Sequence, residues 1–450
     1  MTTDVVSDDV SQTAGWPRES YGWYVVFVLC VCGIVAFIDR QIINLLVEDI
    51  KTDLGVTDVQ ISLLQGLAFA SFYATVAVPL GRLADSVNRR TLIAVAIVLW
   101  TFAAIGCGLA DSYGELFVAR MFIGIGEAVL TPAGFSLLAD YFRPQRISLP
   151  VSVFTGSSFF GSGIALLAGG ALIAYLAGLD ALVFPLVGEL RPWQAAFIIG
   201  ALPGFVVAVW FFLTVKEPER RSNPQLAAGA ELRTGFVQAL AYIKSHGRMF
   251  TGIFFGLSLA AAANFSMGAW VPAFFIRVHG WEASQIGFAY GWLFLFCGSG
   301  GVIAGGWLAN WLHARGYADA NLRTPLLGVL LAVPFALAFT QVESPRLAIV
   351  LMVPLMIFAT LPFGAGSAVL PIVTPTQFRA QLVAIYLLIA NFVGQAGGPW
   401  VVALLTDKVF GDPTKVGNSI TITVGALLLM SAAFLTLGLR PLNQLLTKNK

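Results

Sequence analysis

The sequence predicts an all-α integral membrane protein whose twelve transmembrane helices form two pseudo-symmetric bundles of six. Composition, the length of the apolar runs and an internal repeat lead to this prediction. Of the 450 residues, 58% are hydrophobic and only 11% are charged, and the mean hydropathy is +0.82. Soluble domains carry about 25% charged residues, so this chain is expected to lie within a bilayer.

Twelve apolar runs are each long enough to cross the roughly 30 Å of bilayer hydrocarbon. The longest polar stretch, residues 216–248, separates the first six runs from the last six. We therefore expect a tail at 1–21, bundles at 22–215 and 249–440, a linker between them and a second tail at 441–450. The runs occupy residues 22–47, 58–80, 90–110, 115–139, 149–173, 193–215, 249–275, 285–312, 324–341, 346–372, 380–405 and 419–439.

The two halves repeat each other at two places. The segment GRLAD at 81–85 has its counterpart in GWLAN at 306–310, and GIGEAVL at 124–130 has its counterpart in GAGSAVL at 364–370. A duplicated six-helix unit explains both matches. Paired bundles of this kind place a binding site between them, near the bilayer midplane.

The distribution of basic residues predicts the orientation. With both termini inside, the inner loops and tails hold 18 Lys and Arg, the outer loops hold 6, and helices hold 2. The positive-inside rule then places both termini in the cytoplasm. The linker contains an amphipathic piece at 236–243, expected to be an interfacial helix that connects rather than an adaptor. The apolar outer loop at 174–192 is either a cap over the outer mouth or passive.

Composition also excludes classes of function. The basic residues are dispersed, so nucleic acid is not an expected partner. All four cysteines lie in apolar runs and the three histidines lack metal-ligand spacing, so we expect no metal and no organic cofactor. The chain has no recognisable phosphate loop or nucleophile elbow, and an enzyme is therefore not expected.

Four charges lie inside apolar runs. Arg120 and Glu127 occur in the fourth run, seven residues apart, so they share a helix face about 10 Å apart. A charge at mid-bilayer costs roughly 3 kcal/mol unless it meets a partner or water. Asp39 and Arg40 lie at a similar depth in the first run. Neighbouring helix residues point about 100° apart, so we expect Asp39 to face Arg120 or Glu127, and Arg40 to face the headgroups or another helix.

These four charges sum to zero and have two interpretations. A buried carboxylate beside a mobile arginine can take up and release a proton, which makes Asp39, Glu127 and Arg120 candidates for coupling to a proton gradient. A Glu127→Gln substitution would then abolish that coupling. In the second interpretation the charges are ion pairs that only fix helix packing.

The C-terminal half supplies polar and aromatic groups but no comparable charge within its helix cores. A cavity that is charged on one wall and apolar on the other suits an amphipathic solute, with its head on Arg40 or Arg120. Each other residue in the candidate binding set could equally serve helix packing. The set is Arg40, Arg120, Glu127, Phe37, Thr131, Asn264, Trp270, Tyr290, Ser367 and Asn391.

Several motifs resemble those of a known family. GRLADSVNRR at 81–90 resembles the loop signature of the major facilitator superfamily, and RMFIGIGEA at 120–128 resembles its helix-four motif. Within that superfamily, the FIDR segment at 37–40 and the GQAGGP segment at 394–399 are similar to those of spinster-like carriers. Asn88 stands where most of the superfamily has glycine.

The resemblance implies the major facilitator fold and alternating access, with a lysophospholipid or sphingosine-phosphate-like lipid as substrate and the proton as coupling ion. It also implies a monomer in the cell membrane. Another symporter, for organic anions or sugar acids, is the nearest alternative, and a lipid sensor or scramblase is a third. The resemblance gives a gating role to residues of the loop signature, namely Gly81, Asp85, Arg89 and Arg90, with Asn310 as their counterpart.

Overall fold

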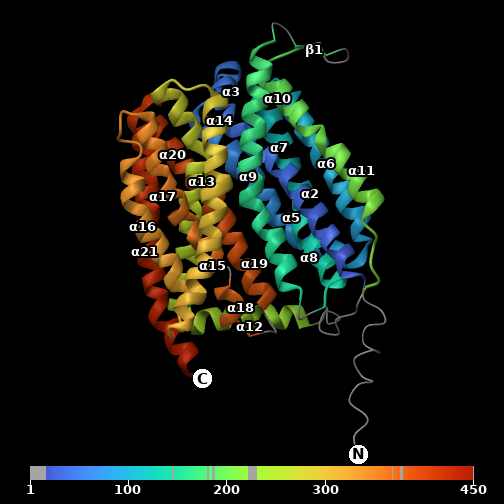
Figure 1. The fold of residues 1–450 in the computed structure, drawn as a ribbon, viewed down its shortest axis with the longest axis vertical. Coiled ribbons are helices and arrows are strands. Elements are labelled where there is room, and N and C mark those ends of the chain that lie inside the picture. The colour runs from blue at the N-terminus through green and yellow to red at the C-terminus, as the bar shows by residue number, and fades with distance from the viewer. Residues whose placement is uncertain are drawn as a thin grey trace, which may run out of the picture.

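The computed structural model describes residues 17–143, 146–179, 182–184, 188–220, 231–366, 368–375 and 379–448. The candidate Ser367 lies outside these ranges, and the side chain of Asp85 is also outside the described part. The described chain is nearly all helical and forms two bundles side by side (Figure 1).

The N-terminal bundle contains the helices of the first six apolar runs, drawn from blue to green in Figure 1. Short polar side chains start several of them by accepting a hydrogen bond from a backbone N–H of the first turn, as Asn88 and Ser112 do. The elements are α2 (Glu19–Leu45), α3 (Val47–Leu54), α4 (Asp58–Ser62), η1 (Leu63–Leu67), α5 (Ala68–Ser86), α6 (Arg89–Gly108), α7 (Tyr113–Glu127), α8 (Leu130–Tyr141), α9 (Ser148–Ala177), α10 (Pro192–Ala201) and α11 (Pro203–Thr214).

The C-terminal bundle contains the remaining six runs, several of them broken by short π-helical segments or by proline. Such breaks free backbone groups, which bundles can satisfy where they face protein. The elements are α13 (Gly247–His279), α14 (Ala283–Trp292), η3 (Leu293–Gly298), α15 (Ser299–Ala314), α16 (Ala320–Ala338), α17 (Pro345–Gly366), α18 (Val369–Val373), α19 (Arg379–Ile389), η5 (Ala390–Gly397), α20 (Gly398–Leu404), η6 (Leu405–Phe410), η7 (Pro413–Lys415) and α21 (Val416–Lys448).

Eleven helices of the described chain are long and apolar enough to cross a membrane. The remaining predicted run is helical from Asp58 to Ser86, as α4, η1 and α5. A two-stranded hairpin departs from the all-α prediction: β1 (Leu182–Phe184) pairs antiparallel with β2 (Gly188–Leu190) in the outer loop. It projects beyond the ends of α9 and α10 (Figure 1).

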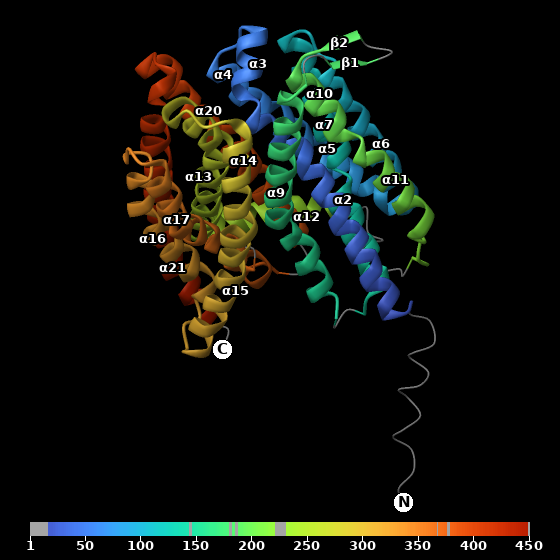
Figure 2. The same ribbon diagram turned by 45° about the horizontal axis from the view of Figure 1, so that its top comes forward.

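The ends of α2 and α21 that lie nearest the chain termini point to the same end of the molecule (Figures 1 and 2). We call this the inner end and the opposite one the outer end. The linker helix α12 (Glu231–Ser245) lies across the inner end, roughly perpendicular to the bundles (Figure 1). Its Tyr242 hydroxyl donates to the Val373 carbonyl at 2.9 Å, which ties it to the C-terminal half.

The two halves approach to backbone contact where α9 meets α14 and η3. A Cβ on Gly163 would lie 2.7 Å from the backbone nitrogen of Leu295, and one on Gly287 would lie 3.1 Å from the Leu166 carbonyl oxygen. Small residues let membrane helices approach to backbone contact. These glycines therefore set the distance between the bundles along this seam.

Candidate functional site

The centre of the N-terminal half contains an ion pair between α2 and α7. Arg40 contacts one carboxylate oxygen of Glu127 through both Nε and Nη2. The Glu127 side chain is 1% exposed whereas that of Arg40 is 24% exposed. Arg40 thus faces another helix, the second of the two positions expected for it, and its partner there is Glu127 on α7.

Three aromatic rings surround the Arg40 guanidinium. Its carbon lies 4.2 Å from the ring centroid of Phe69, 5.1 Å from that of Phe37 and 5.4 Å from that of Tyr73. Cation–π attraction of this kind is worth about 0.5–2 kcal/mol, with the larger values in dry surroundings. The Tyr73 hydroxyl lies 3.4 Å from that of Thr131 on α8, so the rings, Arg40 and Thr131 form one cluster.

Arg120 and Asp39 lie deeper than Arg40. Arg120 is 1% exposed and donates to two main-chain oxygens, that of Asp39 at 2.8 Å and that of Leu64 at 3.3 Å. Asp39 is 2% exposed and interacts electrostatically with Glu127, Arg120 and Arg40. Arg120 therefore fastens α7 to α2 and η1 through backbone groups, and the four charges form one coupled cluster.

Glycine in the helix-four motif allows this cluster to close. A Cβ on Gly124 would lie 2.6 Å from the Phe69 carbonyl oxygen, and one on Gly126 would lie 2.8 Å from the Cβ of Trp100. The backbone of α7 thus lies directly against α5 and α6. This close approach brings the Phe69 ring, on α5, over Arg40.

The C-terminal candidates do not join the cluster. Asn264 donates to the Ala359 carbonyl at 3.0 Å, and the indole of Trp270 donates to the Pro399 carbonyl at 2.9 Å. Tyr290 is fully buried. In this conformation these three side chains pack helices against one another, and their expected contact with a solute stays a prediction. Asn391 is half-buried and donates to its own helix at Leu387.

The loop-signature residues make their contacts within the N-terminal half and at the start of the linker. Arg89 pairs with Asp140 and with Glu217. The side chain of Arg90 donates to the Phe212 carbonyl, and its backbone N–H donates to the Glu217 carboxylate. A Cβ on Gly81 would lie 3.7 Å from Pro132. On the other half, Asn310 is exposed.

Comparison with known sequences identifies the family. The sequence profile of the Major Facilitator Superfamily matches residues 29–399, most of the chain and both bundles. This chain belongs to the Major Facilitator Superfamily. It is therefore a multi-pass protein of a transporter family, not of an enzyme family.

Similar proteins within the superfamily differ in what their names say they carry. An MFS-type efflux pump of Mycolicibacterium smegmatis is 29% identical over 420 residues, 92% of each chain. A probable galactarate/D-glucarate transporter of Bacillus subtilis is 23% identical over 82% of each chain. A sphingosine-1-phosphate transporter of Xenopus tropicalis is 23% identical over 97% of this chain and 84% of its own.

A solved structure supports the fold. The bacterial homologue of the human lysosomal transporter spinster, in an inward-facing and unoccupied conformation, is 24% identical and superposes with a TM-score of 0.77 over 96% of this chain and 98% of its own. This match extends the superfamily fold over both bundles of the chain.

The structure also reveals an ion-pair cluster that sequence reasoning missed. Arg277 at the outer end of α13 donates to Glu48 on α3 at 2.7 Å and to both carboxylate oxygens of Asp58 on α4, each at 2.7 Å. Lys51 also pairs with Asp58, whose side chain is 0% exposed. We call these four residues the outer latch, since they join the two halves of this superfamily fold. In the sequence, Arg277 lies two residues after the apolar run at 249–275, and Asp58 is the first residue of the run at 58–80.

Proposed function

We propose that this protein is a proton-coupled, alternating-access transporter of an amphipathic anionic or zwitterionic lipid, such as a lysophospholipid or a sphingosine-phosphate-like molecule. The observation that carries the proposal is the environment of Arg40. Its guanidinium is partly exposed, is surrounded by aromatic rings and is paired to a buried carboxylate at the end of α7. Intramembrane charges of this kind mark substrate or ion pathways.

The substrate class follows from what surrounds Arg40. A guanidinium binds phosphate bidentately, and its flanking rings offer apolar surface to the adjoining chain. The charged wall comes from one half only, since the described residues of the C-terminal half supply no charged side chain to the cluster. A solute with a charged head and an apolar tail matches that asymmetry. Similarity to a sphingosine-1-phosphate transporter supports the same class.

The proton site follows from the bonding of Glu127. Both Arg40 contacts go to Oε2, whereas Oε1 is buried and lacks a hydrogen-bond partner among the described residues. An orphaned buried acceptor costs about 1–3 kcal/mol, and a proton on this carboxyl group removes the charge that holds Arg40. A headgroup phosphate and Glu127 then compete for Arg40, so binding of the anion favours protonation of Glu127.

The outer latch supplies the conformational step. In this conformation the ion pairs of Arg277 close the outer end between the halves, whereas Arg89 and Arg90 bond within their own half and linker at the inner end. Access from the inner end, followed by opening of the latch and closure of the inner loops, constitutes one transport cycle. Secondary transporters of this architecture rock their bundles in this way.

The test is flux in proteoliposomes with an imposed pH gradient. Wild-type protein is expected to accumulate labelled lysophospholipid or sphingosine phosphate with saturation, and Glu127→Gln is expected to lose gradient-driven flux by at least ten-fold while binding of lipid persists. The matched control is Glu343→Gln, which removes an exposed outer carboxylate and should leave flux unchanged. Gradient-driven flux in the Glu127 variant equal to that of wild type would refute the coupling role.

A sugar-acid symporter is the second candidate, favoured by the similarity to a galactarate/D-glucarate transporter. The same vesicles separate the possibilities. Uptake of a labelled sugar acid without lipid flux would assign the small-anion class. Unsaturable lipid movement that ignores pH would indicate a scramblase, and binding without flux would indicate a sensor.

A further inference from the structure

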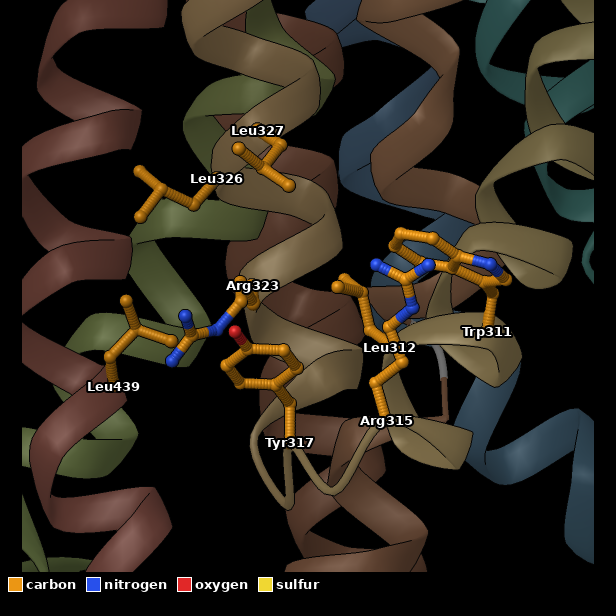
Figure 3. Close-up of a pocket in the computed structure, with 8 residues that line it drawn as sticks. All are labelled: Trp311, Leu312, Arg315, Tyr317, Arg323, Leu326, Leu327 and Leu439. Carbon is orange, nitrogen blue, oxygen red and sulfur yellow. The ribbon is translucent and has the colours of Figure 1, made fainter.

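We propose that the rim of the C-terminal half carries a separate binding site for an acidic phospholipid of the surrounding bilayer, in a hollow where α15, α16 and α21 meet at the inner end. The hollow has a volume of about 440 Å³, within the roughly 300–1,000 Å³ of ordinary ligand pockets. Its lining is shown in Figure 3 and consists of Trp311, Leu312, Arg315, Tyr317, Arg323, Leu326, Leu327 and Leu439.

The lining carries an excess of positive charge. Arg315 is exposed, lies 3.6 Å from the ring centroid of Trp311, and has no carboxylate partner among the described residues. Arg323 is held by Asp319 at 2.9 and 3.2 Å and lies 4.4 Å from the centroid of Tyr317. The hollow thus has two guanidinium groups, of which only Arg323 is paired with a carboxylate among the described residues. An anion is the complement that Arg315 lacks.

The turn between α15 and α16 holds these groups in place. Gly316 has φ +92°, a conformation that side chains disfavour, and it lets the Tyr317 N–H reach back to the Leu312 carbonyl at 3.2 Å. The Asp319 carbonyl then accepts the N–H groups of Leu322 and Arg323, both at 2.9 Å. These backbone hydrogen bonds close the short connection, and Arg315 stands at its start.

The hollow opens toward the hydrocarbon, which identifies the anion as part of a lipid. Ile303, Trp307 and Trp311 recur every four residues on α15 and are 73%, 65% and 38% exposed, a stripe that faces the bilayer. On α16, Leu327 and Leu330 are 37% and 46% exposed. Acyl chains would lie along these residues, with the phosphate at Arg315 and the aromatic rings at the membrane interface.

The site lies far from the proposed transport site. Its helices α16 and α21 are on the side of the molecule away from the N-terminal half (Figure 1), whereas Arg40 lies within that half. It is also at the end that the distribution of basic residues predicts to be cytoplasmic, where the leaflet is rich in anionic lipid and attracts basic residues. A resident structural lipid, rather than cargo, is the expected occupant.

Lipid titration of the full-length protein in neutral detergent, followed by native mass spectrometry, tests the site. Phosphatidylglycerol is expected to bind wild-type protein more tightly than phosphatidylcholine. Arg315→Gln should weaken phosphatidylglycerol binding about five-fold, the contribution of one interfacial basic residue. Trp311→Ala should also weaken it, since the ring orients the guanidinium. The matched control is Arg346→Gln, which removes an exposed arginine at the outer end and should change nothing.

Three results would overturn the proposal. Equal binding of phosphatidylcholine would mean that the hollow takes any bilayer lipid. Equal weakening in the Arg346 variant would mean that net charge alone attracts the lipid. Competition by soluble glycerol phosphate as effective as that by phosphatidylglycerol would mean a site for soluble anions. Because the readout is binding of a lipid class and not flux, none of these results bears on the proposed transport.

Discussion

At the scale of single residues, Arg40 connects the sequence motif to the proposed chemistry. Its guanidinium lies against three rings and one carboxylate, and it is the member of the four-charge cluster that remains partly exposed. By contrast, the guanidinium of Arg120 donates hydrogen bonds to the backbone carbonyls of Asp39 and Leu64. The two arginines therefore differ in role: Arg40 is the one that we propose to bind a solute, and Arg120 holds helices together.

Replacing Arg40 by lysine should impair substrate recognition without unfolding the protein. An ammonium group keeps the charge but loses the planar fork that contacts Glu127 twice and stacks on the rings. We expect the apparent KM for the lipid to rise about ten-fold, measured as concentration-dependent flux in proteoliposomes. Arg146→Lys, at an exposed pair with Glu19, is the control. An unchanged KM in the Arg40 variant would remove this residue from the binding site.

Replacing Arg120 by leucine should destabilise the protein. The Asp39 and Leu64 carbonyls would lose their donor, and the buried Asp39 carboxylate would lose a nearby cation. Breaking a buried charged arrangement costs about 3–5 kcal/mol, so the melting temperature in detergent should fall by several degrees. A melting temperature equal to that of wild type would show that the contacts of Arg120 contribute nothing to stability.

At the scale of helices, glycines decide how close α7 comes to α5. The Cβ that a substitution would add at Gly124 meets main-chain oxygen rather than a movable side chain. Relief therefore requires the helices to separate, which also moves Phe69 away from Arg40. The helix-four motif is in this way a packing device that shapes the site.

Gly124→Val should both lower stability and weaken lipid binding. Overpacking of this kind costs about 1–3 kcal/mol. The matched control lies on the same helix: an added Cβ on Gly114 meets nothing within 4 Å, so Gly114→Val should be far milder in its effect on lipid affinity. Equal lipid affinities for the two variants, measured by titration, would contradict the role given to the α5–α7 contact.

At the scale of the whole molecule, the outer latch joins the two halves at the outer end. Its ion pairs cross between α13 of one half and α3 and α4 of the other. Removing one of these ion pairs shifts the equilibrium between the conformations with a closed and an open outer end. The size of the shift equals the difference between the stabilisation that the pair gives to the two conformations. The pair of Arg191 with Asp53, at the same end, lies within the N-terminal half.

Arg277→Gln should shift the population toward an open outer end, because it leaves Asp58 with Lys51 alone. Loss of one partner from a buried pair costs about 2–5 kcal/mol. Spin labels at Thr52 and Glu343, one on each half, should report longer distances in electron double resonance. Arg191→Gln is the control and should leave the distances unaltered. Identical distance distributions for wild type and the Arg277 variant would mean that the latch does not govern closure.

The spanning helices, the duplication and the superfamily were all predictable from the sequence. The thickness of the hydrocarbon sets the length of each apolar run, and the repeated motifs can be read directly from neighbouring residues. The four intramembrane charges were visible for the same reason. Which of them pair was decided only by tertiary structure, because helix rotation brings Arg40 into the ion pair with Glu127. Packing likewise buries Trp270 and Tyr290. The same holds for the rings of Phe69 and Tyr73 around Arg40 and for the partners of Arg277, because in each case the contacting residues lie on different helices. No local sequence pattern shows which helices pack together.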